Sequence, residues 1–114
     1  LKGENYVYAF PELTENKVIL IKGETLSSIT ITVEDFINKE VNNKINLLIG
    51  SALAEAKSRG LLGDEIKVND SYRNLMDFLN KNQDTDIYLE AVSLRRSKTA
   101  QPVVVEITFQ QILP

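Results

Sequence analysis

The feature that most constrains the fold is a long stretch with the hydrophobic period of a helix, which directly follows a stretch with the hydrophobic period of a strand. Between residues 28 and 33, apolar and polar side chains alternate, which is the period of a strand with one wet face. From Ile37 to Ala56, apolar residues recur at three- and four-residue spacing, which predicts an amphipathic helix. The chain must therefore pack a helix against a sheet.

The boundaries of this helix are marked by capping residues. Thr32 and Asp35 fit a capping box whose acidic member replaces the usual Glu, and Arg59 with Gly60 supplies a cation and a stop. A continuous helix from Val33 to Arg59 would be about 40 Å long at ~1.5 Å per residue. A compact chain of this size has a diameter of roughly 35 Å. Either the helix breaks near Asn42-Asn43, two poor helix formers, or one of its ends projects past the core, and we expect the break or bend.

The remaining segments are short. Asp70 or Ser71 can cap a second helix that runs to about Asn82, with Tyr72, Leu75, Met76 and Leu79 on one face. The stretch "LLGDEIKV" before it is interpreted as a loop. The other predicted elements are strands: Tyr6–Phe10, Val18–Lys22, Ile87–Leu94, which we place centrally in a sheet, and Val103–Ile112.

This order, β-β-β-α-α-β-β, predicts an α+β fold. We expect an antiparallel β-sheet or partly open barrel, with two helices inserted between the N-terminal and C-terminal strands. At 114 residues the chain is long enough for one hydrophobic core, so residues 1–114 are predicted to form a single domain. Because the first residue is Leu1 rather than methionine, the sequence is also compatible with a segment of a longer protein.

Composition excludes several classes of function. The sequence has no cysteine and no histidine, so thiol chemistry and a Ser-His-Asp triad are impossible. A net charge of −3 argues against a nucleic-acid binder, since phosphate binding requires a basic face. The longest apolar run, Val18 to Ile21, is far shorter than the ~20 residues of a membrane span. We expect neither nucleic acid nor membrane as a partner.

The sequence contains no complete catalytic or metal-binding pattern. Asn82, Asp84 and Asp86 have the spacing that opens a calcium loop, but Ile87 stands where glycine is needed and Ser93 where an acidic ligand is needed. Ser97 beside Lys98 is a conceivable nucleophile and base, yet adjacent loop residues rarely face one another. We expect a protein that is not an enzyme, without catalytic residues, metal or cofactor.

The segment Ser93–Pro114, "SLRRSKTAQPVVVEITFQQILP", contains a basic loop in an acidic protein. If the last two strands pair as a hairpin, the connection "RRSKTAQP" is longer than the usual two to five residues. A solvated loop is the simple interpretation. The alternative is a subunit contact in which Arg95, Arg96 and Lys98 face an acidic surface such as that of Glu34, Asp35 and Glu40, in a head-to-tail assembly.

A family resemblance bears on this segment. "AVSLRRSKTAQPVVVEITFQQI" resembles the end of the Dit-like N-terminal domain of phage tail and baseplate proteins, and "ALAEAKSRGLLGDEIKV" is similar to an upstream segment of that family. The family's N-terminal motif with histidine and glycine is absent. The resemblance implies a non-enzymatic virion component that assembles as a homo-oligomer with other virion proteins, with Arg95, Arg96 and Lys98 at subunit contacts. The alternative is a monomeric, non-enzymatic binding or regulatory domain of a bacterial protein.

Overall fold

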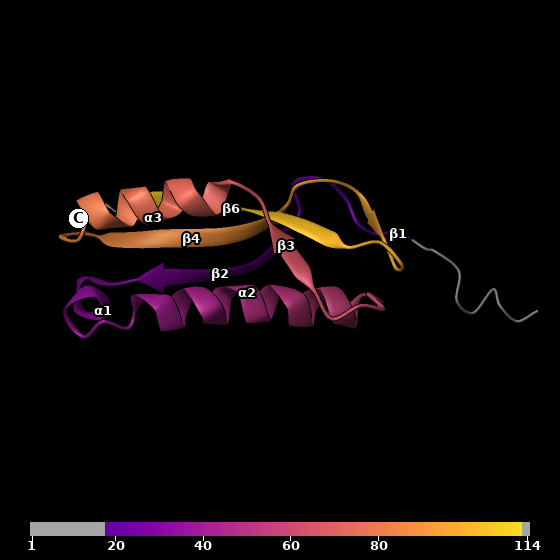
Figure 1. Ribbon diagram of the computed structural model, residues 1–114, viewed down its shortest axis with the longest axis horizontal. Helices are drawn as coiled ribbons and strands as arrows, with labels where there is room; N and C mark the ends of the chain where they lie inside the picture. Colours follow the sequence, from indigo (N-terminus) through magenta and orange to yellow (C-terminus); the bar gives the residue numbers. More distant parts are fainter. Residues whose placement is uncertain (1–17, 113–114) are drawn as a thin grey trace, which may run out of the picture.

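The computed structural model describes residues 18–112, which form an α+β fold with open sheets and no closed barrel (Figure 1). The predicted strand Tyr6–Phe10 lies outside the described residues. The elements follow in the order β1 (Val18–Leu20), β2 (Thr25–Ile31), α1 (Val33–Ile37), α2 (Val41–Ser58), β3 (Ile66–Val68), α3 (Ser71–Lys81), β4 (Asp86–Ser93), β5 (Ser97–Lys98) and β6 (Val103–Ile112).

Four strands form the main sheet in the order β2-β4-β6-β3. β4 is central, as predicted, and pairs antiparallel with β2 on one side and with β6 on the other. The register places Leu89 between Ile29 of β2 and Phe109 of β6. The bounds predicted for β6 are confirmed: burial alternates along the strand, and Pro102 stands just ahead of it.

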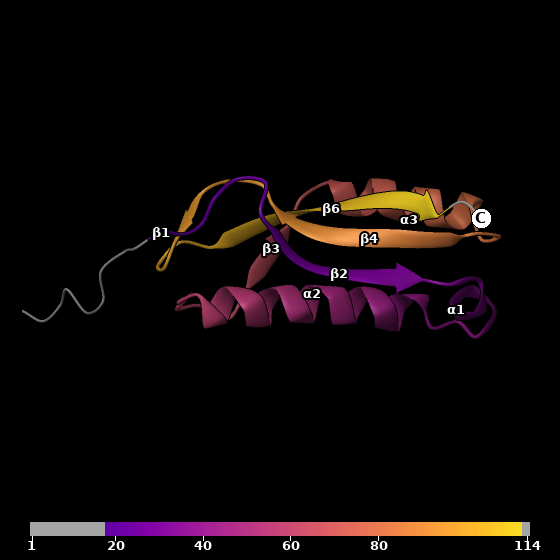
Figure 2. The same cartoon turned by 180° about the vertical axis from the view of Figure 1, so that it is seen from behind.

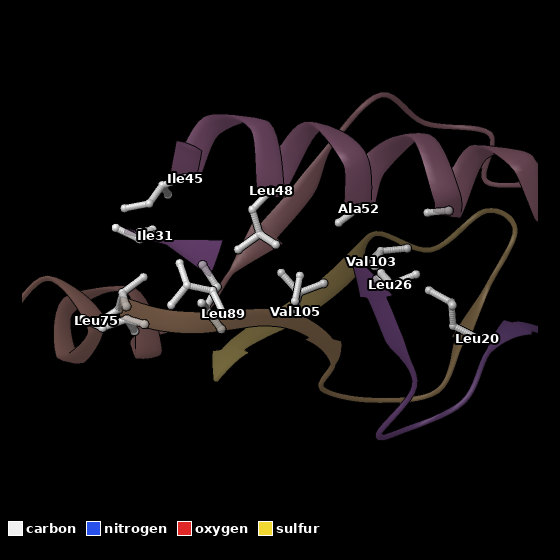
Figure 3. Close-up of a cluster of buried hydrophobic side chains, with 14 of the residues drawn as sticks. Leu20, Leu26, Ile31, Ile45, Leu48, Ala52, Leu75, Leu89, Val103 and Val105 are labelled. Atoms are coloured by element: carbon white, nitrogen blue, oxygen red, sulfur yellow. The ribbon is translucent and has the colours of Figure 1, made fainter. Parts of the chain in front are cut away.

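Both helices cover the same face of this sheet. In β4, residues 87, 89, 91 and 93 are buried, whereas residues 86, 88, 90 and 92 on the opposite face are only half-buried. α2 packs on β2 and α3 packs on β6, as Figures 1 and 2 show from opposite sides. Figure 3 shows side chains from both helices meeting those of the sheet, among them Ile45, Leu48, Leu75 and Leu89. Each fully buried Leu or Ile contributes about 1.5–3 kcal/mol.

The long helix breaks earlier than predicted. α1 ends at Ile37 and α2 begins at Val41, so the break lies before Asn42-Asn43 and the expected position is wrong. Lys39 has a φ of 59°, which reverses the chain locally and separates the two helices. The predicted capping box is confirmed: Thr32 N–H donates to Asp35 Oδ2 at 2.8 Å, and Asp35 N–H donates to Thr32 Oγ1 at 3.2 Å.

The connection between α2 and α3 contains a strand that the sequence did not predict. Residues Ile66–Val68 form β3, which pairs in parallel with Val103–Val105, so the sheet is mixed rather than purely antiparallel. α3 then starts at Ser71, but neither expected side chain caps it, because Asn69 Oδ1 accepts the N–H of Ser71 at 3.0 Å. Leu75 and Leu79 are buried as predicted, whereas Tyr72 is exposed because it lies in the first turn, at the end of the covered face.

We predict that Thr32→Ala lowers the free energy of unfolding by about 1 kcal/mol, since it removes the side-chain acceptor of the Asp35 N–H at the helix start. Thr32→Ser keeps the hydroxyl and should recover most of this loss. Urea unfolding followed by circular dichroism measures both variants, and equal stability of the two would contradict the capping role.

Candidate interaction site at the edge of β6

The basic loop predicted from the sequence is not a simple protrusion. Ser97–Lys98 forms β5, which pairs antiparallel with β1. Arg95 and Arg96 are exposed and Lys98 is half-buried, while Ser97 and Thr99 between and beyond them are buried. The long connection is therefore folded into a second small sheet.

Two of the three cationic residues form hydrogen bonds within the loop. Arg95 Nη2 donates a long bond of 3.4 Å to the Pro102 carbonyl, and the Lys98 N–H donates to Gln101 Oε1 at 3.0 Å. The acidic surface expected to meet them on another subunit includes α1, which lies at the opposite end of the molecule from β1, the partner of β5 (Figure 1). The subunit contact of Arg95, Arg96 and Lys98 stays a prediction.

Asp35 belongs to the framework of the fold. Its carboxylate accepts the Thr32 N–H and lies 3.1 Å from Lys44 Nζ, and these two contacts hold the pKa of Asp35 below its usual value. Lys44 Nζ also donates to the carbonyl of Thr30 on the outer edge of β2, at 3.2 Å. Lysine at a sheet edge discourages pairing with another strand. The β2 edge of the main sheet is therefore protected against pairing with another strand.

The opposite edge is built differently. β3 covers β6 only as far as Val105, whose carbonyl accepts the N–H of Asn69 just after the β3 ladder. The Ile107 N–H then donates to Ser71 Oγ at 2.9 Å, so the first turn of α3 caps one more position. Because outward backbone groups recur at every second residue of a strand, those of Phe109 and Gln111 also point away from β4.

Within the described residues 18–112, β4 alone pairs with β6 beyond Val105, and no hydrogen-bond partner lies opposite the groups that point away from β4. We name the backbone groups of Ile107 C=O, Phe109 and Gln111 the open β6 edge. The residues that carry it, "ITFQQI", include no charged side chain. Such a segment has the composition that favours strand pairing.

Side chains hold the open β6 edge in place on the helix face. The rings of Phe78 and Phe109 lie 4.6 Å apart between centroids, and Gln111 Nε2 donates to Asn82 Oδ1 at 3.3 Å and to Thr85 Oγ1 at 3.1 Å. At the same end of the sheet, Tyr88, Gln110, Gln111 and Ile112 line a hollow of about 420 Å³. The edge is thus extended, contacted by side chains on the helix side and flanked by space.

Other chemistry is sparse in the described part of the chain. Residues 18–112 contain no group of three carboxylates that could hold a metal ion. No helix within residues 18–112 is both long and apolar enough to cross a bilayer. The carboxylates whose pKa is lowered all face a cation: Glu24 faces Arg59, Asp35 faces Lys44 and Asp64 faces Lys57.

Comparison with known families settles the affiliation. A family described as the DUF3084-associated C-terminal helical hairpin matches residues 20–111. The chain belongs to this family. No significant match is found among curated proteins or solved structures.

The family assignment corrects the resemblance to Dit-like phage domains, which is wrong. That resemblance rested mainly on the β4–β6 segment, and a strand, a charged turn and a terminal strand occur in many folds. In this member of the DUF3084-associated family, the two longer helices run in opposite directions (Figure 1), and both pack on the buried face of the main sheet. The assignments to a virion and a phage tail depended on the resemblance and have no other support.

We predict that Ser71→Ala destabilises the fold by about 1–3 kcal/mol, because it leaves the N–H of buried Ile107 without its acceptor. Ser58→Ala is a matched control, since the Ser58 hydroxyl donates to Glu55 at an exposed helix end and its loss should cost under about 0.5 kcal/mol. Urea unfolding gives both values. Equal effects of the two substitutions would contradict the capping of β6.

We also predict a pH dependence from Asp35. A folded-state pKa below the unfolded value stabilises the protein above about pH 4, and this stabilisation is lost as the pH falls through the folded pKa. The difference in unfolding free energy between the wild type and Asp35→Asn should therefore be constant from pH 7 to 5 and shrink below about pH 4. Urea unfolding at each pH measures it, and a constant difference down to pH 3 would disprove this assignment.

Proposed function

We propose that this domain is a non-enzymatic protein-interaction module that binds an extended polypeptide segment by strand addition to the open β6 edge. The observation that carries the proposal is the set of outward backbone groups at Phe109 and Gln111, which have no partner within residues 18–112. In strand addition, main-chain hydrogen bonds supply affinity and pockets beside the edge supply specificity.

The contrast between the two sheet edges supports this function. Lys44 guards the outer edge of β2, whereas the open β6 edge carries no charge over residues 107–112. Proteins usually protect long uncharged edges with lysine, proline or a short strand, because such edges pair with other chains. An edge that lacks this protection on a fold that protects its other edge is best explained by a partner.

The position of α3 restricts the kind of partner. α3 packs over β6, and Phe78 contacts Phe109 directly. If β6 of a second copy paired here, the two α3 helices would lie about one strand spacing apart, ~4.8 Å, whereas packed helices need 8–10 Å. The partner is therefore a lone extended segment without a helix above it.

Site-specific photo-crosslinking tests this proposal. A photoreactive amino acid at Thr108, which is exposed beside the open β6 edge, should join a peptide from outside β4 and β6 when the protein is irradiated in its native cells. The matched control is the same residue at Leu47, which is 59% exposed on the outer side of α2. Mass spectrometry of the digested protein identifies the joined peptide.

We expect one dominant peptide at position 108 and only scattered, weak products at position 47. Products of equal yield and variety at both positions, or none at position 108, would refute the proposed function.

A further inference from the structure

We infer that the segment bound at the open β6 edge belongs to another protein and is a cationic amphipathic strand. Its Lys or Arg side chains lie on the face of the sheet opposite the helices, next to Glu90 and Glu106, and its apolar side chains lie on the helix side. This inference rests on the proposed function and names the chemistry of the partner.

The face of the main sheet opposite the helices carries two carboxylates close to the open β6 edge. Glu90 of β4 pairs with Thr108 of β6, and Glu106 stands two residues before Thr108. Because side chains alternate between the faces of a strand, all three residues lie on the face opposite the helices. A side chain that a bound strand places beside Thr108 has Glu106 as its diagonal neighbour, and Glu90 lies beyond the small Thr108.

Neither carboxylate is neutralised by a cation of the described residues. No ion pair within residues 18–112 involves Glu90 or Glu106. Tyr88 Oη donates to Glu90 Oε2 at 3.1 Å, which orients this carboxylate and leaves its second oxygen for another donor. Lys67, the one cation in the four strands of the main sheet, pairs with Val104 near the start of β6. A cation of the bound segment therefore has two carboxylates to pair with.

The helix side of the edge selects apolar side chains instead. The rings of Phe78 and Phe109 contact each other there, and both remain only partly buried. An apolar side chain of a bound strand beside Phe109 would cover the exposed part of these rings, which is favourable because apolar surface leaves water. Valine or isoleucine suits this position, since both also favour the strand conformation. The bound segment thus alternates apolar residues with cations.

This alternation is supplied by a different protein. Within residues 1–114, two cations stand two residues apart only at Lys57 and Arg59 and at Arg96 and Lys98, and a serine separates each pair. The chain therefore contains no segment in which cations alternate with apolar residues. Its net charge of −3 also favours the approach of a cationic partner.

Three synthetic peptides with blocked ends test the inference. Their sequences are TVKVKVT, TVQVQVT and TVEVEVT, so they differ only at two alternate positions. Each is titrated at low salt into the protein of residues 1–114, and NMR shifts of the Phe109 and Gln111 amides give the dissociation constants. These amides point away from β4, whereas the amide of Gln110 faces β4 and should shift less.

We expect TVKVKVT to bind about tenfold more tightly than TVQVQVT at low salt, because Glu90 and Glu106 attract its cations. TVEVEVT should bind most weakly, since its carboxylates are repelled. The advantage of TVKVKVT should shrink when the salt concentration is raised to about 0.5 M, which screens exposed charges.

A pair of matched variants places this selectivity at the proposed residues. Glu90→Gln/Glu106→Gln should lower the affinity for TVKVKVT to that for TVQVQVT, and should leave the affinity for TVQVQVT unchanged. The control Glu34→Gln/Glu65→Gln removes two exposed carboxylates outside the strands of the sheet and changes the net charge equally. This control should keep the preference for TVKVKVT.

Three results overturn the inference. They are equal affinities of the wild type for TVKVKVT and TVQVQVT, an unchanged preference in Glu90→Gln/Glu106→Gln, and no shift of the Phe109 and Gln111 amides with TVKVKVT. Circular dichroism of each variant confirms that it is folded, and glutamine at position 90 can still accept the hydrogen bond of Tyr88.

The proposed function and this inference fail separately. If the peptides show no preference for cations but photo-crosslinking at position 108 captures one dominant peptide, the edge binds a strand and the chemistry inferred for that strand is wrong. If photo-crosslinking also captures nothing at position 108, both the proposed function and the inference are wrong.

Discussion

The antiparallel pairing of β4 with β6, covered by helices on one face only, is the constraint on which the rest of the structure depends. It buries the odd-numbered residues from Ile87 to Ser93 and from Val103 to Ile107 under α2 and α3. Once β4 is central, each backbone group of β6 that does not face it must find a partner elsewhere. β3 and Ser71 satisfy the first of these groups, and the groups at Phe109 and Gln111 remain for a further strand.

The ion pairs of the domain hold its elements together, and they contribute to the lowered pKa of Glu24, Asp35 and Asp64. Arg59, at the end of α2, bonds both Glu24 in the turn before β2 and Glu55 one helical turn earlier, which holds the pKa of Glu24 below its usual range. Asp35 and Lys44 tie the start of α1 to α2 and to the edge of β2. These charges are paired for structure, so the unpaired backbone of β6 is the feature that best indicates function.

The hydrophobic period of the sequence located most helices and strands, because the burial of one face of a helix or strand imposes that period directly. The alternation in Val103–Phe109 and the spacing of Leu75 and Leu79 predicted β6 and α3 closely. β3 was missed because three residues are too few to show a period, and only the parallel pairing with Val103–Val105 makes them a strand. The helix break was misplaced because propensity pointed to Asn42-Asn43, while the chain turns at Lys39. A short stretch of similar sequence misled the family assignment for a related reason, since strand and turn patterns recur in unrelated folds.

By itself the sequence determined the α+β class, the capping box at Thr32 and the strands that alternate, because these depend on local preference and on the period of burial. It also showed that residues 107–112 are uncharged and favour a strand. Only the tertiary structure decided that β3 stops at Val68, that Ser71 caps Ile107 and that the β6 edge is then open. The reason is physical: whether a backbone group has a partner depends on which distant segment lies beside it, and no local pattern records that.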